Sequence, residues 1–386
     1  MNRGGCERHL LEVLPAIEVD RFEIEIFLLF ERGELSSEME ARGIRVHGPW
    51  VSSEKGRNPW LRCLGMAVVS LQLWLHFLIR RPHIAHFFLP ASYLIGAPVA
   101  IAAGIRRRVM SRRSLNVYQQ GRPVVSAMER ALHRMTTAFV GNCRRIARQL
   151  IDEENVPAAR TTVIYNGVRV PPMPTREERE RKRAALNVTR DAFVMVIVAN
   201  LIPYKDHETL LRACALLQSR HAGEWTLLVI GRDDGVGGNL RRLAAELGIA
   251  PNVRFLGERD DVVSILPACD LGLLVSRQEG FSNALLECMA AGLPMLVTDV
   301  GGNPEAVREG VTGCIVPAGD ESAMADRIAA FAQDAERRRA MGLAGRDRVD
   351  SHFGIDRCVS DYEKLYSDIA ADGFRGNIPP LAEREG

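Results

Sequence analysis

The second half of the chain alternates short apolar runs with longer amphipathic segments, and this rhythm restricts the fold more than any other feature. "AFVMVIVAN" (192–200), "WTLLVIG" (225–231) and "LGLLVS" (271–276) are typical of buried strands. The segments between them have the length and apolar spacing of helices, as in "HETLLRACALLQSR" (207–220). Strands separated by such helices build right-handed βαβ units, so a parallel sheet is predicted.

The first half shows a weaker form of the same rhythm. "FEIEIFLLF" (22–30), "HIAHFFL" (83–89) and a short segment in "RRVMSRR" (107–113) are predicted strands. A proline-rich segment, "RVPPMPTREERERKR" (169–183), separates the halves, and its charged run is expected to be a solvated helix face. A chain of 386 residues is long for one core. We therefore predict an α/β fold with two doubly wound, Rossmann-like domains facing a central cleft.

Composition excludes several classes of protein. A net charge of +2 does not indicate a general nucleic-acid binder. The eight cysteines form no C-x-x-C pair and no Cys/His cluster with zinc spacing, so a reduced, cytoplasmic compartment is expected. The opening "MNRGGCERHL" lacks the apolar region of a signal peptide.

One apolar stretch bears on membranes. "LGMAVVSLQLWLHFLI" (64–79) is short for a span of about 20 residues. Arginines 57, 62, 80 and 81 flank it. It is expected to be a core helix or one that grazes a membrane surface.

The segment "SRQEGFSNALLECMAAGLP" (276–294) follows a predicted strand, at the edge of the sheet where open α/β folds bind ligands. Ser282 or Asn283 can cap a helix that runs to about Ala291, Gly292 suits the position after its end, and Pro294 prevents its continuation. The amides of residues 281–284 and the helix dipole would then form an anion site suited to phosphate.

Charged residues around this site suggest a nucleotide-sugar. Lys205 follows the strand at 192–200 and could add a cation to the phosphate site. A carboxylate beside phosphate needs a hydroxyl-bearing partner, so Glu279 is expected to bind a sugar. Glu287, about one and a half turns into the helix, could hold a ribose diol.

With these residues in place, "EGFSNALLE" (279–287) resembles the E-x7-E signature of retaining glycosyltransferases with the GT-B fold, known as glycosyl transferases group 1 or family 4-like. The resemblance extends over nearly the whole chain, including "GGCERHLLEVLPAI" (4–17), "TVIYNGV" (162–168) and "VANLIPYKDHETLL" (198–211). It implies an acceptor-side domain over 1–170 and a nucleotide-sugar-binding domain over 171–354. A helix over 355–372 would cross back to the first domain, and 373–386 would be a disordered tail.

The resemblance assigns roles to individual residues. Glu279 and Lys205 would be catalytic, and Glu287 would hold the ribose. The remaining donor-binding residues that it implies are Gly280, Phe281, Ser282, Asn283, Asn200, Gly4, Gly5 and, weakly, Arg254. The glycines of the N-terminal loop would allow a close approach to the diphosphate.

Three features depart from the family pattern. The chain opens at "MNRGG" without the usual leading strand, and Asn200 stands where the family often has an arginine. A histidine common near the acceptor is replaced by "VMSRRSLN" (109–116), which offers Ser111, Arg112 and Arg113. These arginines could meet an anionic acceptor such as a lipid diphosphate, or form a solvated basic loop. His86 could be a catalyst, but a packed strand histidine is the stronger interpretation.

The implied activity is transfer of a hexose from a UDP- or GDP-sugar to a saccharide or lipid-linked saccharide, with retention and without a metal or other cofactor. Same-face attack and double displacement by Glu279 both remain open. Cell-envelope or exopolysaccharide biosynthesis at the inner face of the cytoplasmic membrane would be the setting. The alternatives are a nucleotide-sugar 2-epimerase-like isomerase and a non-catalytic nucleotide-sugar-binding relative.

Overall fold

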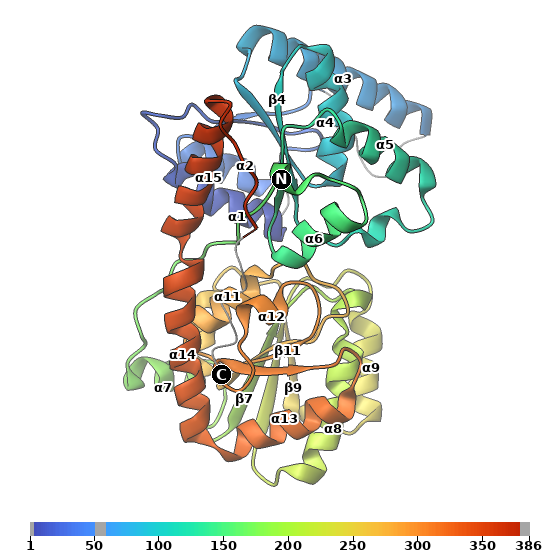
Figure 1. Cartoon of the computed structure of the whole chain (residues 1–386). Helices are drawn as coiled ribbons and strands as arrows, with labels where there is room; N and C mark the ends of the chain where they lie inside the picture. Colours follow the sequence, from blue (N-terminus) through green and yellow to red (C-terminus); the bar gives the residue numbers. More distant parts are fainter. Residues whose placement is uncertain (1–3, 51–58, 379–386) are drawn as a thin grey trace. The chain divides into compact units, whose positions relative to one another are not determined.

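The structure, a computed structural model, describes residues 4–50 and 59–378. The chain folds into two compact units (Figure 1). Unit 1 comprises residues 1–167 and 355–386, and unit 2 comprises residues 168–354. Each unit is built from parallel strands connected by helices, as the strand–helix rhythm predicts.

Unit 1 contains two parallel sheets. β1 (Glu25–Phe27) pairs with β2 (Arg45–His47), and a separate sheet has the order β3-β4-β5-β6. The strands of this second sheet are β3 (Ile84–Phe88), β4 (Arg107–Arg112), β5 (Ala138–Gly141) and β6 (Thr161–Val163). The helices of unit 1 are α1 (Gly5–Val13), α2 (Glu34–Ala41), α3 (Pro59–Arg80), α4 (Pro90–Ala102), α5 (Pro123–His133), α6 (Arg144–Asp152) and α15 (Ile355–Ala370).

The predicted strands of unit 1 form, but the first is shorter than its apolar run. Only three residues of the 22–30 segment form a ladder with β2, although Leu28 N also donates to His47 O at 2.8 Å. Phe22, Ile24 and Leu28 pack on the core outside this ladder, whereas Phe30 is 47% exposed. Within the described residues, no strand precedes α1. One apolar cluster joins α1, β1, β2, β4, β5 and α15, so both sheets share a core.

The last part of the chain packs against unit 1. Tyr362, Leu365 and Ile369 of α15 are buried in the shared core. Part of the segment expected to be a disordered tail makes hydrogen bonds to β6 and to the turn before it. Gly376 N donates to Ala159 O at 2.7 Å, and the Asn377 carbonyl accepts from Thr162. Residues 379–386 lie outside the described part.

Unit 2 is a six-stranded parallel sheet of order β12-β11-β10-β7-β8-β9 (Figure 1). Its strands are β7 (Phe193–Val198), β8 (Trp225–Ile230), β9 (Val253–Gly257), β10 (Leu271–Leu274), β11 (Met295–Thr298) and β12 (Gly313–Val316). Its helices are α7 (Arg176–Ala185), α8 (His207–Arg220), α9 (Gly237–Glu246), α10 (Val262–Ile265), α11 (Asn283–Ala290), α12 (Asn303–Ala306), α13 (Glu321–Gln333) and α14 (Ala335–Phe353). Apolar residues of α8, α9 and α13 pack on one face of the sheet, while α11 packs beside α14.

The strand order places a topological switch point in the middle of this sheet. From β7 the chain builds outward through β8 and β9, then returns to the other side of β7 with β10. The loops after β7 and β10 therefore leave neighbouring strands in opposite directions, and ligands of open α/β sheets bind in the crevice that such loops form.

Most of the charged run of α7 is exposed, as expected of a solvated helix face, but one arginine is buried. The Arg183 side chain is buried and donates to the carbonyls of Ala268 and Ala192 at 3.0 and 2.9 Å. Arg183 and Arg179 also bind the two oxygens of Asp270, each at 2.6 Å. These interactions fasten α7 to the sheet next to the start of β10.

Helix α3 carries the apolar stretch at 64–79. By length and composition alone, Cys63–Arg80 is long and apolar enough to cross a membrane, and 28% of it is buried. Trp60, Leu64 and Ile79 are exposed at 82%, 62% and 77%, whereas Val69, Leu73 and Phe77 pack into the core of unit 1. One face of α3 therefore packs into the core of unit 1, and another face is apolar but exposed. Arg57 and the side chain of Arg62 lie outside the described part.

Candidate active site

Lys205 and Glu279 meet at the switch point of unit 2. A 3-10 turn, Pro203–Lys205, follows β7, and Glu279 lies in the loop that follows β10. The Lys205 ammonium donates to Glu279 Oε1, and the two side chains are only 16% and 9% exposed. The sequence predicts both residues in one site, but their direct pairing was not predicted.

Two hydroxyl-bearing residues hold the Glu279 carboxylate and the backbone beside it in position. Ser276 Oγ donates to Glu279 Oε1 at 2.7 Å, and the backbone carbonyl of Ser276 accepts from Thr298 Oγ1 at 2.6 Å. Thr298 ends β11, the next strand of the sheet. Both hydroxyl-bearing residues are completely buried, so the carboxylate is oriented from three adjacent strands.

A glycine pair after β11 supports the same loop. Gly302 N donates to Gly280 O at 2.7 Å. Gly301 has a φ of +54°, and a Cβ there would overlap the Glu279 carbonyl oxygen, so both the backbone conformation and the close approach require glycine. This pair was missed from the sequence, although two consecutive glycines shortly after a short apolar run are a recognisable signal.

Helix α11 begins and ends as its sequence predicts. Ser282 is the N-cap and accepts from Leu285 N, while Gly292 follows the last turn with a φ of +81°. Phe281, just before the cap, is buried against Phe353 of α14 with ring centroids 5.2 Å apart. The positive end of the α11 dipole therefore lies beside Glu279, and Glu287 sits partly buried on the second turn of the helix.

A second ion pair, also missed, ties the loops of β7 and β10 together. Arg277 Nε lies 2.9 Å from Asp206 Oδ2, and Arg277 N donates to Tyr204 O at 2.8 Å. Asp206 is buried and also accepts from Thr209 of α8. Arg277 thus holds both Tyr204 and Asp206, the residues on either side of Lys205.

Two predicted donor-binding residues of unit 2 differ in their placement. Asn200 follows β7, and its Oδ1 accepts from Arg232 N at 3.3 Å, so it lies at the edge of the sheet that carries Lys205. Arg254 is the second residue of β9, at the opposite end of the strand. Its guanidinium donates to Leu186 O and Asn187 O, where α7 ends, so the structure gives Arg254 a helix-capping role instead of a role in the donor site.

In unit 1, His86 and Ser111 are packed against each other. His86 Nε2 lies 2.8 Å from Ser111 Oγ, and Nδ1 lies 2.9 Å from the Tyr366 hydroxyl of α15. Burial, reinforced by Arg113, lowers the pKa of His86 from 6.5 to about 3. A neutral, fully partnered histidine is the packed strand residue that the sequence favours over a catalyst.

Arg112 does not face a ligand, which corrects its expected contact with an acceptor. It is 1% exposed, and its two terminal nitrogens bind Glu129 at 3.0 Å and Glu154 at 2.8 and 3.0 Å. His133 Nε2 lies 2.9 Å from Glu154 Oε2. Hydrogen bonds from His133 and Arg112 outweigh burial and lower the pKa of Glu154 to about 2. Arg112 is therefore part of a buried ion network with Glu129, His133 and Glu154.

Arg113 and the N-terminal glycines lie in the same part of unit 1. Arg113 is partly exposed, and its guanidinium donates to Asn166 Oδ1 at 2.8 Å. Gly4 is the N-cap of α1, and Gly5 is its first residue. Burial raises the pKa of Cys6 to about 11 against the opposing charge of Arg113. The start of α1 thus lies near the carboxyl end of β4, with Arg113 as its cation.

Comparison with known proteins decides the family. The model for "Glycosyltransferase Family 4" matches residues 3–170, and that for "Glycosyl transferases group 1" matches residues 178–348. A D-inositol 3-phosphate glycosyltransferase of Salinispora tropica is 33% identical over 401 residues, which cover 96% of this chain and 82% of that protein. The chain belongs to the group 1 glycosyltransferases.

One further relative and one solved structure extend this result. An N-acetyl-alpha-D-glucosaminyl L-malate synthase of Bacillus anthracis is 39% identical over 137 residues, 36% of each chain. The crystal structure of Anabaena Alr3699/HepE in complex with UDP-glucose has a TM-score of 0.82 at 20% identity, covering 95% of this chain and 97% of that one. The predicted GT-B fold of the glycosyltransferase is confirmed.

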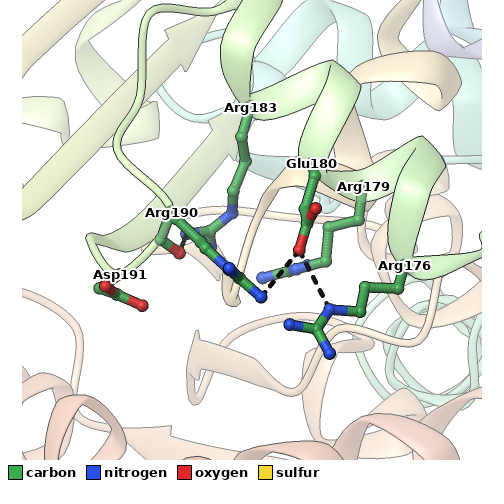
Figure 2. Close-up of a pocket in the computed structure, with 6 residues that line it drawn as sticks. All are labelled: Arg176, Arg179, Glu180, Arg183, Arg190 and Asp191. Carbon is green, nitrogen blue, oxygen red and sulfur yellow. Dashed lines mark hydrogen bonds and ion pairs between the residues drawn. The ribbon is translucent and has the colours of Figure 1, made fainter.

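A pocket of about 400 Å³ in this glycosyltransferase lies elsewhere, beside α7 (Figure 2). Its lining residues are Arg176, Arg179, Glu180, Arg183, Arg190 and Asp191. Glu180 binds both Arg176 and Arg190, at 3.0 and 3.1 Å, and Asp270 binds the other two arginines. Because β7 starts just after Asp191, the pocket is at the amino ends of the strands, opposite the Lys205–Glu279 pair.

Proposed function

We propose that this glycosyltransferase moves a hexose from a nucleoside diphosphate sugar to an acceptor hydroxyl, with retention and without a metal at the donor site. The observation that carries the proposal is the Lys205–Glu279 pair at the switch point, beside the N-terminus of α11. UDP-sugars are the first donors to test, because a protein of the same fold was solved with UDP-glucose. GDP-sugars are the second.

The chemistry follows from the charges around this pair. As the glycosidic bond to the diphosphate breaks, negative charge builds on the leaving phosphate. The Lys205 ammonium and the positive end of α11 would stabilise that charge, which is usually the largest catalytic contribution. Glu279 would then accept hydrogen bonds from hydroxyls of the donor sugar, and Glu287 from the ribose. Retention would arise from same-face attack, with double displacement by Glu279 as the competing route.

For the acceptor, we propose a saccharide or lipid-linked saccharide of the cell envelope or of an exopolysaccharide. The uncovered apolar residues of α3, Trp60 and Leu64 at its start and Ile79 at its end, would rest on the inner face of the cytoplasmic membrane, with the exposed Arg81 following Ile79. The names of two relatives favour a second candidate, a small anionic acceptor, since they specify inositol 3-phosphate and malate. Arg113 is the cation that would meet the phosphate of a lipid-linked saccharide or the charge of a small anionic acceptor.

Substitution of Glu279 and Lys205 tests the proposal. Glu279→Ala is expected to lower the rate of transfer from UDP-sugars by at least about 100-fold while nucleotide binding stays measurable. Lys205→Ala is expected to weaken binding of free UDP or GDP, because the ammonium would contact the diphosphate itself. Donor turnover would be followed by nucleotide release, in EDTA, and binding by calorimetry.

Lys364→Ala is the matched control, because Lys364 is an exposed lysine of α15 whose ion pair with Asp368 lies in unit 1. It should leave both measurements unchanged. Near-normal transfer by Glu279→Ala would show that the site is wrongly assigned. Epimerised donor without released nucleotide would support the isomerase, and tight donor binding without turnover would support the non-catalytic relative.

A further inference from the structure

Among the described residues, Glu25, His47 and His76 bring three possible metal ligands together in unit 1. Glu25 opens β1, His47 ends β2, and His76 lies in the last turns of α3. The parallel register places Phe27 opposite His47, so Glu25 and His47 project from the same face of the two-stranded sheet. None of these residues belongs to the donor site.

The spacing of the donor atoms fits a zinc ion. Glu25 Oε2 lies 3.3 Å from His47 Nε2 and 3.5 Å from His76 Nε2, and all three atoms are within 4.8 Å of one another. With zinc–ligand bonds of about 2.0–2.1 Å, a tetrahedral ion holds neighbouring donors about 3.3–3.4 Å apart. Both distances to the carboxylate therefore match the edge of a zinc coordination sphere.

A second observation points to a missing partner. His47 Nε2 is buried and makes no hydrogen bond to any described group, although polar atoms in protein interiors are nearly always satisfied. The side chains of His76, Glu25 and His47 are 16%, 13% and 37% exposed, so the three groups converge in a partly enclosed place that an ion can reach from solvent. An imidazole nitrogen with its lone pair directed at such a place is a typical metal ligand.

Neighbouring residues hold the three ligands in position. Gln72, one turn before His76 on α3, donates to Gly48 O at 2.8 Å and accepts from Trp50 N at 2.8 Å, so it fastens the helix to the segment that follows His47. Arg80 Nε donates to Glu25 Oε2 at 3.2 Å. Such outer contacts orient the ligands of metal sites.

The charge balance permits a cation. Arg45 and Arg80 both pair with Glu25, chiefly through Oε1, and both also pair with Glu23. Two carboxylates thus offset two guanidinium groups, and the second lone pair of Glu25 Oε2 remains for a metal. The other described triad, Glu129, His133 and Glu154, differs because the Arg112 side chain on its carboxylates is 1% exposed and enclosed, whereas Arg45 and Arg80 are 53% and 39% exposed and can move aside.

We propose that Glu25, His47 and His76 form a binding site for a zinc-class divalent ion that links β1, β2 and α3. Two imidazoles and one carboxylate are a ligand set that zinc favours, and water would complete the tetrahedron. The bound ion would clamp the small sheet to the end of the helix.

Metal binding by the full chain, after treatment with EDTA, tests this proposal. Zn²⁺ would be titrated against a chromophoric competitor, and Co²⁺ would report the geometry through its visible ligand-field absorption. We expect one equivalent of Zn²⁺, and at least about tenfold weaker binding by His76→Ala and Glu25→Gln. His83→Ala, which alters an exposed histidine, and Cys63→Ser, which alters the exposed cysteine, should bind as the wild type does.

Zn²⁺ should also raise the thermal midpoint of the wild type and of His83→Ala, but not that of His76→Ala. Should His76→Ala fail to fold, His76→Gln keeps the length of the side chain and replaces it in both measurements. Wild-type affinity in the His76 and Glu25 variants would overturn the proposal. So would a wild-type chain that shows no tetrahedral Co²⁺ spectrum and no stabilisation by Zn²⁺.

Discussion

Gly301 holds the loop after β11 against the loop that carries Glu279. Its positive φ and the absence of a Cβ serve different purposes, because the first sets the turn and the second admits the Glu279 carbonyl. Gly310 is a comparison position at which only the first of these two effects is present. It also has a positive φ, of +73°, but a Cβ there would meet nothing within 4 Å.

We therefore expect Gly301→Ala to displace Glu279 and lower the rate of transfer by about 100-fold, as displacements of about 1 Å can do. Gly310→Ala should cost about 1 kcal/mol of stability, through backbone strain alone, and keep wild-type kinetics. Steady-state assays and thermal unfolding of the two variants check this. Equal activity in both would mean that the close approach at Gly301 does not position the carboxylate.

At the same scale, Arg112 shows what sequence cannot give. Arg112 and Arg113 in "VMSRRSLN" (109–116) were expected to meet an anionic acceptor or to form a solvated basic loop, but adjacent positions of a strand point to opposite faces. Arg112 therefore enters the interior and binds Glu129 and Glu154, which lie 17 and 42 residues away. Lys205 and Glu279 are 74 residues apart in the chain, and their direct pairing could not be predicted from the sequence either.

At the scale of elements, local signals were enough for α11. Ser282, Gly292 and Pro294 act within a few residues of the helix that they delimit, so its limits were predictable to within one residue. The length of β1 depends on its pairing with β2, and the burial of Arg183 in α7 depends on Asp270, far along the chain. Both were mispredicted because their causes are not local.

Helix α7 offers a test of this difference. Arg183→Ala removes a buried guanidinium that binds Asp270 and several carbonyls, and should lower the free energy of unfolding by about 3 kcal/mol. Arg176→Ala removes an exposed i,i+4 pair with Glu180 and should change it by less than about 0.5 kcal/mol. Urea unfolding of both variants provides the comparison. Similar stabilities would show that α7 is not fastened through Arg183.

At the scale of the whole molecule, buried neutral histidines make stability depend on pH. Burial lowers the pKa of His86 to about 3 and that of His9 well below 6.5 in unit 1. In unit 2, burial and Lys205 lower the pKa of His207 to about 4. The unfolded chain therefore binds more protons than the folded chain below about pH 6.5, and stability falls as pH decreases through that value.

Each of these histidines should add a loss of stability whose slope rises from about 0.7 kcal/mol per pH unit at pH 6.5 towards about 1.4 kcal/mol per pH unit near pH 5. His86→Gln keeps an amide near Ser111 and Tyr366 but cannot take up a proton, so its loss of stability should be shallower by that amount. Urea unfolding in EDTA from pH 7.5 to 5 measures both slopes. A wild type whose stability is constant or rises as pH falls would contradict the prediction.

The ion pair between Lys205 and Glu279 has a consequence for what the site rejects. A bare anion such as inorganic phosphate would draw the ammonium away and leave a carboxylate that is 9% exposed without its cation, which is costly. A ligand with hydroxyls next to its phosphate would satisfy both groups at once. The site without ligand would thus bind a whole donor more tightly than its fragments, including the nucleotide that remains after transfer.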